Sequence, residues 1–267
     1  MCVSLSWPHG ADLSPPAVRP VLPPGVPPVG FLCARGRAGS ARLRVMRITL
    51  PSGTPAEVHK VDNPRMGLVI APDIWGLRPL FDDIVRDLAG KWQMNVAAVE
   101  LFPGRDLPLD DMGPRAAEIP KLDDDANLAD MEAAADVLGT PVNGMIGFCL
   151  GGMYAFKASR SNRFARIVPF YGMITVPEGW RSATQGEPLA CLLQGNADNV
   201  MAILGDNDPY TPLSDIDQLR STGATAVVYA GAEHGFVHDP SRASHRAADA
   251  ADAWQRTEAW LLGALRG

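Results

Sequence analysis

The chain has 267 residues, of which 46% are hydrophobic, with a formal net charge of −6 and four cysteines. It is long enough for one ordinary α/β domain or two small ones, and apolar enough to bury a large core. The acidic balance argues against nucleic-acid binding, and no apolar run approaches the roughly 18 residues of a membrane span. The cysteines, at positions 2, 33, 149 and 191, form no C-x-x-C pair. We therefore expect reduced thiols in a cytoplasmic protein.

Residues 1–45 differ in composition from the rest of the chain. Eight of the 24 prolines fall within the first 30 residues, which favours extended, unpaired backbone. The prolines also interrupt every candidate apolar core of a signal peptide. We predict a disordered extension over 1–45, or sequence upstream of a true start at Met46, followed by one domain over 46–267. A targeting or contact role for this arginine-rich arm is the alternative.

From residue 43 onward, apolar strand patterns alternate with helical ones. We expect strands near 43–50, 56–61, 67–72, 95–99, 142–148, 166–171, 200–204 and 225–229. We expect helices near 79–90, 126–138, 213–221 and 243–264, and another from Leu150 onward. Residues 105–125 read as a long irregular loop over the site, and 173–199 show little pattern. The alternation predicts an α/β fold, a doubly wound and mostly parallel sheet flanked by helices.

The run Gly147-Phe148-Cys149-Leu150-Gly151-Gly152 joins a predicted buried strand to a predicted helix. It has the form of the G-x-S-x-G nucleophile elbow, with cysteine in place of serine. Glycines two residues before and after the nucleophile remove side chains that would collide in so sharp a turn. The helix N-terminus then directs N–H groups and partial positive charge at the sulfur. The alternative is a buried structural cysteine in a glycine-rich turn.

Four predicted strands end in groups able to do chemistry: Asp73, Cys149, Asp208 and His234. Ligands of such sheets lie beyond the carboxyl ends of the strands. The order nucleophile, acid, histidine is that of α/β-hydrolases. We predict that His234 takes the thiol proton and that Asp208 orients its ring, with Asp206 as the alternative acid.

An oxyanion formed at Cys149 needs hydrogen-bond donors fixed in advance. The backbone N–H of Leu150, directly after the nucleophile, is one candidate. The N–H of Ile74, at the end of the strand over 67–72, is the other.

With these motifs in place, residues 46–267 resemble the dienelactone hydrolase family, the carboxymethylenebutenolidases. The resemblance rests on the Cys149 elbow, on Gly205-x-x-Asp208 with Pro212 following, on His234-Gly235-Phe236, and on Asp73-Ile74-Trp75-Gly76. It implies an α/β-hydrolase fold and a triad of Cys149, Asp208 and His234. It also implies hydrolysis of cyclic enol esters without a metal or organic cofactor.

Two positions depart from the best-known members of that family. Where they carry a glutamate that modulates the thiol, this chain has Asp73, which is shorter by one methylene. Where members acting on dienelactone carry an arginine that grips the substrate carboxylate, this chain has His238. Arg78 or Arg115 is the candidate replacement.

Other polar and aromatic residues have simpler alternatives. Trp75 and Tyr171 are candidate pocket residues or ordinary core aromatics. Glu233, His234, His238 and Asp239 resemble a metal cluster only in composition. They contain no H-E-x-x-H pattern and follow a strand, so we expect no metal site.

The sequence therefore predicts a cysteine-dependent carboxylic-ester hydrolase acting on a small-molecule ester or lactone through a thioester. A thioesterase or acyl-transfer enzyme is the second possibility, and a non-catalytic ligand-binding or thiol-redox protein the third. We expect no nucleic-acid or membrane partner, and a monomer or weak homo-oligomer.

Overall fold

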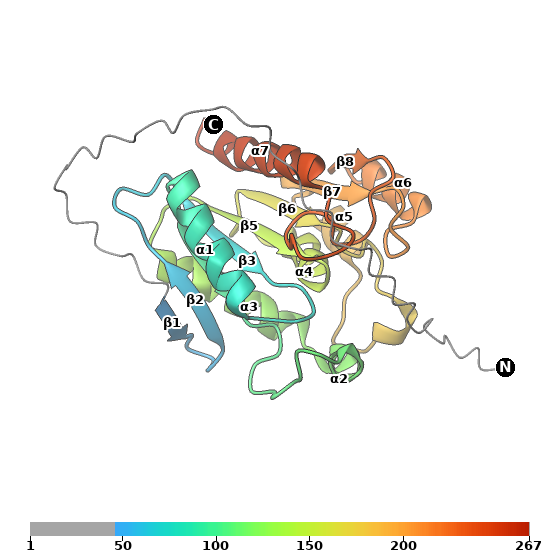
Figure 1. Cartoon of the computed structure of the whole chain (residues 1–267), viewed down its shortest axis with the longest axis horizontal. Helices are drawn as coiled ribbons and strands as arrows, with labels where there is room; N and C mark the ends of the chain where they lie inside the picture. The colour runs from blue at the N-terminus through green and yellow to red at the C-terminus, as the bar shows by residue number, and fades with distance from the viewer. Residues whose placement is uncertain (1–45, 267) are drawn as a thin grey trace, which may run out of the picture. The chain divides into compact units, whose positions relative to one another are not determined.

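A single eight-stranded sheet forms the centre of the domain in the computed structural model, which describes residues 46–266 (Figure 1). The strand order is β1-β2-β4-β3-β5-β6-β7-β8. β1 (Met46–Thr49), β2 (Pro55–His59) and β4 (Asn95–Val99) pair antiparallel in that order. The remaining pairings are parallel and involve β3 (Gly67–Ala71), β5 (Asn143–Phe148), β6 (Arg166–Phe170), β7 (Met201–Gly205) and β8 (Thr225–Tyr229).

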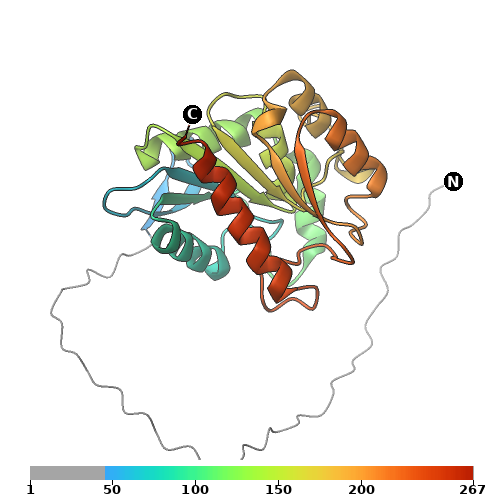
Figure 2. The same cartoon turned by 90° about the horizontal axis from the view of Figure 1, so that it is seen from above.

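Helices cover both faces of the sheet, as Figure 2 shows. α1 (Pro79–Trp92) and α7 (Ala247–Gly263) pack on one face. α3 (Asp124–Leu138), α4 (Leu150–Ala158) and α6 (Leu213–Ser221) pack on the other, where α5 (Pro188–Gln194) lies against α4. The predicted doubly wound α/β fold is therefore confirmed.

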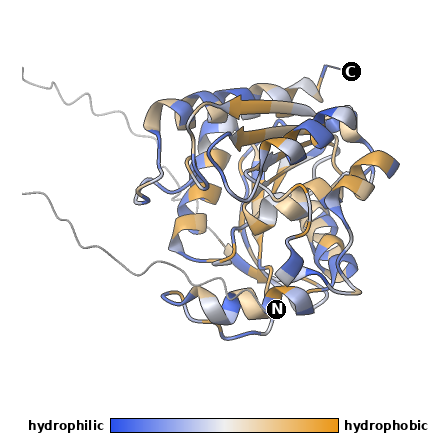
Figure 3. Cartoon of the chain, turned by 90° about the vertical axis from the view of Figure 1, so that its right-hand side faces the viewer, coloured by the Kyte–Doolittle hydropathy of each residue, from blue (hydrophilic) through white to orange (hydrophobic). Residues whose placement is uncertain are grey.

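The central strands are apolar on both sides because each face of the sheet is covered. In β3, Leu68 and Ile70 join the core beneath α1 and α7, whereas Val69 joins the opposite core. This is the period of two expected for a strand, without the polar alternation of a half-exposed one. Figure 3 shows the hydrophobic strands inside helices of mixed hydropathy.

Two stretches expected to be irregular contain helices. Residues 105–125 hold α2 (Met112–Glu118) and a short 3-10 helix, Ile119–Lys121, and α3 already begins at Asp124. The Asp111 carboxylate caps α2 by accepting from the Gly113 N–H at 2.8 Å, a local signal that the acidic composition obscured. Residues 173–199 hold α5 and the 3-10 helices Glu178–Trp180 and Ala197–Asn199.

The extension predicted over residues 1–45 lies outside the described residues. Within 46–266, no helix combines the length and the apolarity needed to cross a membrane.

A buried ion pair fixes the helix that follows the elbow. The fully buried Lys157 of α4 donates from Nζ to Asp124 Oδ1 and Gln185 Oε1, both at 2.8 Å. Asp124 Oδ2 also accepts from the Gly186 N–H at 2.6 Å. Burial lowers the pKa of Lys157, and the Asp124 carboxylate opposes that shift. The pair therefore ties α4 to the start of α3 and to the segment before α5.

Removing the lysine charge should destabilise the domain strongly. We expect Lys157→Met to lower the free energy of unfolding by about 3–5 kcal/mol, because the Asp124 carboxylate would remain buried without its cation. Chemical denaturation measures this loss. The control Lys121→Met removes an exposed partner of Glu118 and should change stability by less than about 1 kcal/mol. Equal, small losses in the two variants would contradict the role given to Lys157.

Candidate active site

Cys149 stands at the turn between β5 and α4 with φ 55° and ψ −115°. Such a conformation costs a non-glycine residue on the order of 1–3 kcal/mol. The neighbouring backbone leaves no room for side chains on either side of it. A Cβ on Gly147 would lie 2.0 Å from the Gly151 carbonyl oxygen, and one on Gly151 would lie 2.1 Å from that of Ala71. The Cys149 N–H donates to the Phe170 carbonyl at 3.1 Å, which holds the turn against β6.

The predicted histidine and acid meet in the loops that follow β8 and β7. His234 Nδ1 lies 2.8 Å from Asp208 Oδ2. The other oxygen of the buried Asp208 carboxylate accepts from the Tyr210 N–H at 2.9 Å, so the acid is held from two sides. The alternative acid, Asp206, accepts instead from the backbone of Gly231.

The protonation of His234 reflects its neighbours. Burial alone would lower its pKa, but the charge of the Cys149 sulfur and the hydrogen bonds with Asp208 and Cys149 raise the pKa of His234 to about 10. These neighbours therefore favour the protonated form of the ring, which is hydrogen-bonded to the Asp208 carboxylate. The structure brings the three predicted side chains together.

Two backbone N–H groups were predicted to bind an oxyanion. Leu150 is the first residue of α4, where a helix leaves its N–H groups unpaired. Ile74 follows β3, and its N–H has no acceptor within residues 46–266. Both groups are therefore available as donors.

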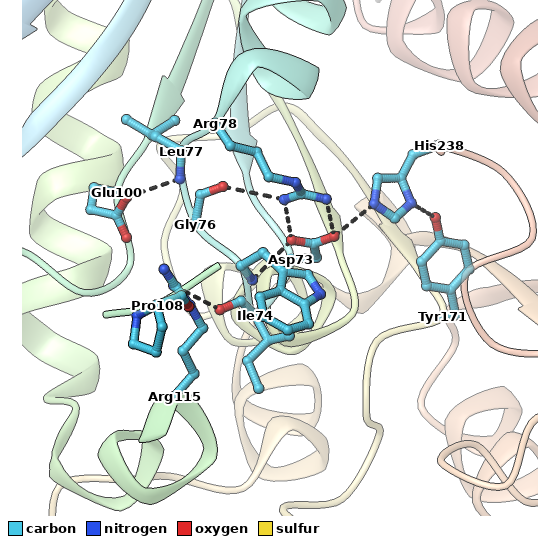
Figure 4. Close-up of polar contacts among 11 residues, drawn as sticks. Asp73, Ile74, Gly76, Leu77, Arg78, Glu100, Pro108, Arg115, Tyr171 and His238 are labelled. Carbon is cyan, nitrogen blue, oxygen red and sulfur yellow. Dashed lines mark hydrogen bonds and ion pairs between the residues drawn. The ribbon is translucent and has the colours of Figure 1, made fainter. Parts of the chain in front are cut away.

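The loop that carries Ile74 is anchored at several points, shown in Figure 4. The buried Arg115 donates to the carbonyl of Ile74 at 3.2 Å and to that of Pro108 at 2.8 Å. On the other side, Glu100 accepts from the Leu77 N–H at 2.9 Å. The candidate oxyanion donor thus sits on a rigid support.

A buried polar chain runs from this loop to the end of β6 (Figure 4). Arg78 binds Asp73 through two parallel hydrogen bonds of 2.6 and 2.8 Å. His238 Nε2 lies 2.9 Å from Asp73 Oδ2, and its Nδ1 is hydrogen-bonded to the Tyr171 hydroxyl. The Tyr171 ring in turn meets the His234 ring edge-on at a centroid distance of 5.2 Å.

The charges of Asp73 and His238 determine which groups donate in this row of hydrogen bonds. Burial would raise the pKa of Asp73, but hydrogen bonds from His238 and Arg78 hold it far below its usual range. Burial lowers the pKa of His238, although Asp73 opposes this shift. Since the carboxylate is ionised and the imidazole neutral, Nε2–H donates to Asp73 and Nδ1 accepts from Tyr171.

This arrangement changes the reading of the pocket candidates. Arg78 and Arg115 were the candidates for binding a substrate carboxylate. In the structure Arg78 donates hydrogen bonds to Asp73, and Arg115 donates to backbone carbonyls. Tyr171 and His238 are buried, and of the two it is the Tyr171 ring that packs against His234. Trp75 is half-buried, and its backbone N–H donates to the Asp73 carboxylate at 3.0 Å.

Sequence reasoning missed Tyr210. Its ring meets the His234 ring edge-on at a centroid distance of 4.8 Å, and the residue is 37% exposed. Because Tyr210 lies only two residues after Asp208, the sequence could have indicated that it is close to the site. In the part of the chain that the structure describes, no cluster of histidine, cysteine and acidic side chains is arranged to hold a metal.

Comparison with known proteins gives concordant matches. The model of the dienelactone hydrolase family matches residues 54–265. A Bradyrhizobium protein named "Probable 2-oxo-3-(5-oxofuran-2-ylidene)propanoate lactonase" is 27% identical over 215 residues, which is 75% of this chain and 84% of that protein. A carboxymethylenebutenolidase of Rhodococcus opacus is 27% identical over 207 residues, 71% of this chain and 78% of its own.

A crystal structure from Klebsiella pneumoniae, described as a "Putative Dienelactone Hydrolase", has a TM-score of 0.71 and 25% identity, covering 82% of this chain and 98% of that one. The family match over residues 54–265 and this structural similarity confirm the resemblance read from the motifs. The family match covers well over half of the sequence, and the chain belongs to the dienelactone hydrolase family of hydrolase enzymes.

Proposed function

We propose that this hydrolase cleaves a carboxylic ester or enol lactone through a covalent thioester on Cys149. The observation that carries the proposal is the meeting of Cys149 with His234 and Asp208 at the elbow. Because Nδ1 of His234 is bonded to Asp208, Nε2 is the nitrogen available to the sulfur. A protonated imidazole beside it favours the thiolate, which is the nucleophilic form.

The first half of the reaction forms the thioester. The Cys149 thiolate attacks the carbonyl carbon, and the negative charge on the oxygen is stabilised by the N–H groups of Leu150 and Ile74. The tetrahedral intermediate then collapses with cleavage of the carbon–oxygen bond. Nε2 of His234 gives its proton to the leaving oxygen, as general acid.

The second half releases the acid. Neutral His234 takes a proton from water as the water attacks the thioester carbonyl, and the sulfur leaves as a thiolate. Asp208 stabilises the imidazolium that forms. In a lactone the leaving hydroxyl stays tethered to the acyl group, so attack by water must be faster than closure of the ring.

The names of the relatives support an ester or lactone as the substrate, and a separate consideration concerns the nucleophile. The relatives named above include a lactonase and a carboxymethylenebutenolidase. A cysteine nucleophile also needs a reduced thiol, which agrees with a cytoplasmic protein.

Turnover tests the proposal. We expect the protein to hydrolyse a simple aryl ester or an enol lactone, and Cys149→Ala to lower kcat/KM by at least about 100-fold because the nucleophile is lost. The control Cys191→Ala removes the other free thiol within the described residues and should leave turnover within twofold, as an order of magnitude. Equal rates for wild type and a folded Cys149→Ala would end the proposal. If acyl thioesters are tested beside the esters and are hydrolysed faster, the protein is a thioesterase.

The pH profile tests the pairing of His234 with Asp208. Asp208 raises the pKa of His234, so Asp208→Asn should move the alkaline decline of kcat/KM from near pH 10 to a lower pH, as well as reduce the maximum. The imidazolium would then lose its proton earlier as pH rises. In the control Asp206→Asn the decline should stay in place, because Asp206 binds Gly231. A shift in the control alone would assign the orienting role to Asp206.

A further inference from the structure

A partly open cavity of about 530 Å³ lies between α1 and α7, the two helices that cover one face of the sheet (Figure 2). Its size is within the range of small-molecule sites. Leu80, Ile84 and Leu88 line it from α1, at a spacing of four residues that places them in one row along the helix. On the opposite side α7 contributes small side chains and one ring, those of Ala247, Ala250, Ala251 and Trp254. Because alanine side chains are short, they leave the space between the two helices open.

The lining of this cavity is partly aromatic. Trp92 and Trp254 both line it and meet edge to face, with their ring centroids 5.8 Å apart. Trp254 lies at the same centroid distance from Phe148, the residue before Cys149. Contacts between rings contribute about 0.5–1.5 kcal/mol per pair beyond the apolar area that they bury. The cavity therefore favours a flat aromatic ligand.

One polar atom of the lining lacks a hydrogen bond. His245 contributes to the cavity, and its Nδ1 is buried without a partner among the residues that the structure describes. Leaving such a nitrogen unsatisfied costs roughly 1–3 kcal/mol. A hydroxyl group can donate to this nitrogen or accept from it, so it fits either tautomer of the ring.

The charged groups of the lining are already neutralised. Asp83 is paired with Arg86, and Asp87 with Lys91 at 3.1 Å. Burial lowers the pKa of His238, which also lines the cavity, so its ring adds no charge. A charged ligand would lose hydration there without gaining a free counter-charge, and a neutral ligand is favoured.

We propose that this cavity binds a neutral aromatic compound with a hydroxyl group, at a site separate from Cys149. The ring of the ligand lies between the apolar row of α1 and the alanines of α7, and its hydroxyl group is hydrogen-bonded to His245. An occupant also touches His238, whose Nε2 donates to Asp73 in the loop that carries the Ile74 N–H. The cavity is thus an effector site beside the candidate active site, and its existence does not depend on the reaction proposed above.

Calorimetric titration with 2-naphthol tests the site, using the protein before and after alkylation of Cys149 with iodoacetamide. We expect saturable binding with a dissociation constant below about 1 mM in both forms, since the alkylated elbow is not part of the cavity. Binding that alkylation abolishes would place the ligand at Cys149 and overturn the proposal. Failure to saturate would overturn it too, whereas loss of esterase activity would have no bearing on it.

Two exposed alanines of α7 provide a matched pair of variants. Ala251 lines the cavity and Ala248 does not. Ala251→Trp should fill the space and weaken 2-naphthol by at least about tenfold, whereas Ala248→Trp should leave its affinity within about twofold. Equal effects of the two substitutions would contradict the location. Sedimentation shows whether Ala251→Trp changes the oligomeric state, a result that would make the cavity an interface between copies of the chain and overturn the proposal.

The hydroxyl group is tested by comparing 2-naphthol with naphthalene, which lacks it. His245→Phe should weaken 2-naphthol by about fivefold, the loss of one net hydrogen bond, and leave naphthalene within about twofold. An equal loss for both compounds would overturn the assignment of His245 as the partner of the hydroxyl group.

Discussion

The active site depends on one backbone contact, the approach of the turn at Cys149 to the ends of β3 and β5. Gly147 and Gly151 stand so close to neighbouring carbonyl groups that a single extra carbon on either would collide with the main chain. That closeness holds Cys149 in a conformation with a positive φ of 55°. The strain is tolerable because both cores of the domain and the buried Lys157–Asp124 pair hold the surrounding elements in place.

Around this turn the loops have separate tasks. The loops after β7 and β8 supply Asp208 and His234, while the loop after β3 supplies the Ile74 N–H and is held by Glu100 and Arg115. The candidate site is thus assembled from segments far apart in sequence, each at the carboxyl end of a parallel strand.

The sequence was sufficient to predict the strands, helices and turns whose residues alone specify them. β4, α6 and β8 have the expected bounds, because short apolar runs bounded by turn residues specify them. The glycines around Cys149 predicted the turn for a steric reason that the structure shows directly. α2 was missed because a buried Arg115 that binds backbone carbonyls looks, in sequence, like an exposed charge.

The partners of Asp73 could not be predicted for a different reason. Arg78 is five residues away, but His238 is 165 residues away and reaches the carboxylate only because the loop after β8 folds over the end of β3.

The burial of the Arg78–Asp73–His238 chain has a consequence for the conditions under which the site keeps its shape. The side chain of Asp73 is 1% exposed and that of His238 is fully enclosed, whereas an ordinary surface pair such as Arg86–Asp83 is 50% and 64% exposed. Dissolved ions weaken an exposed pair as the salt concentration rises, because the screening length falls to about 3 Å at 1 M, but they screen a buried pair much less. The loop after β3 is therefore held by attractions that concentrated salt leaves largely intact.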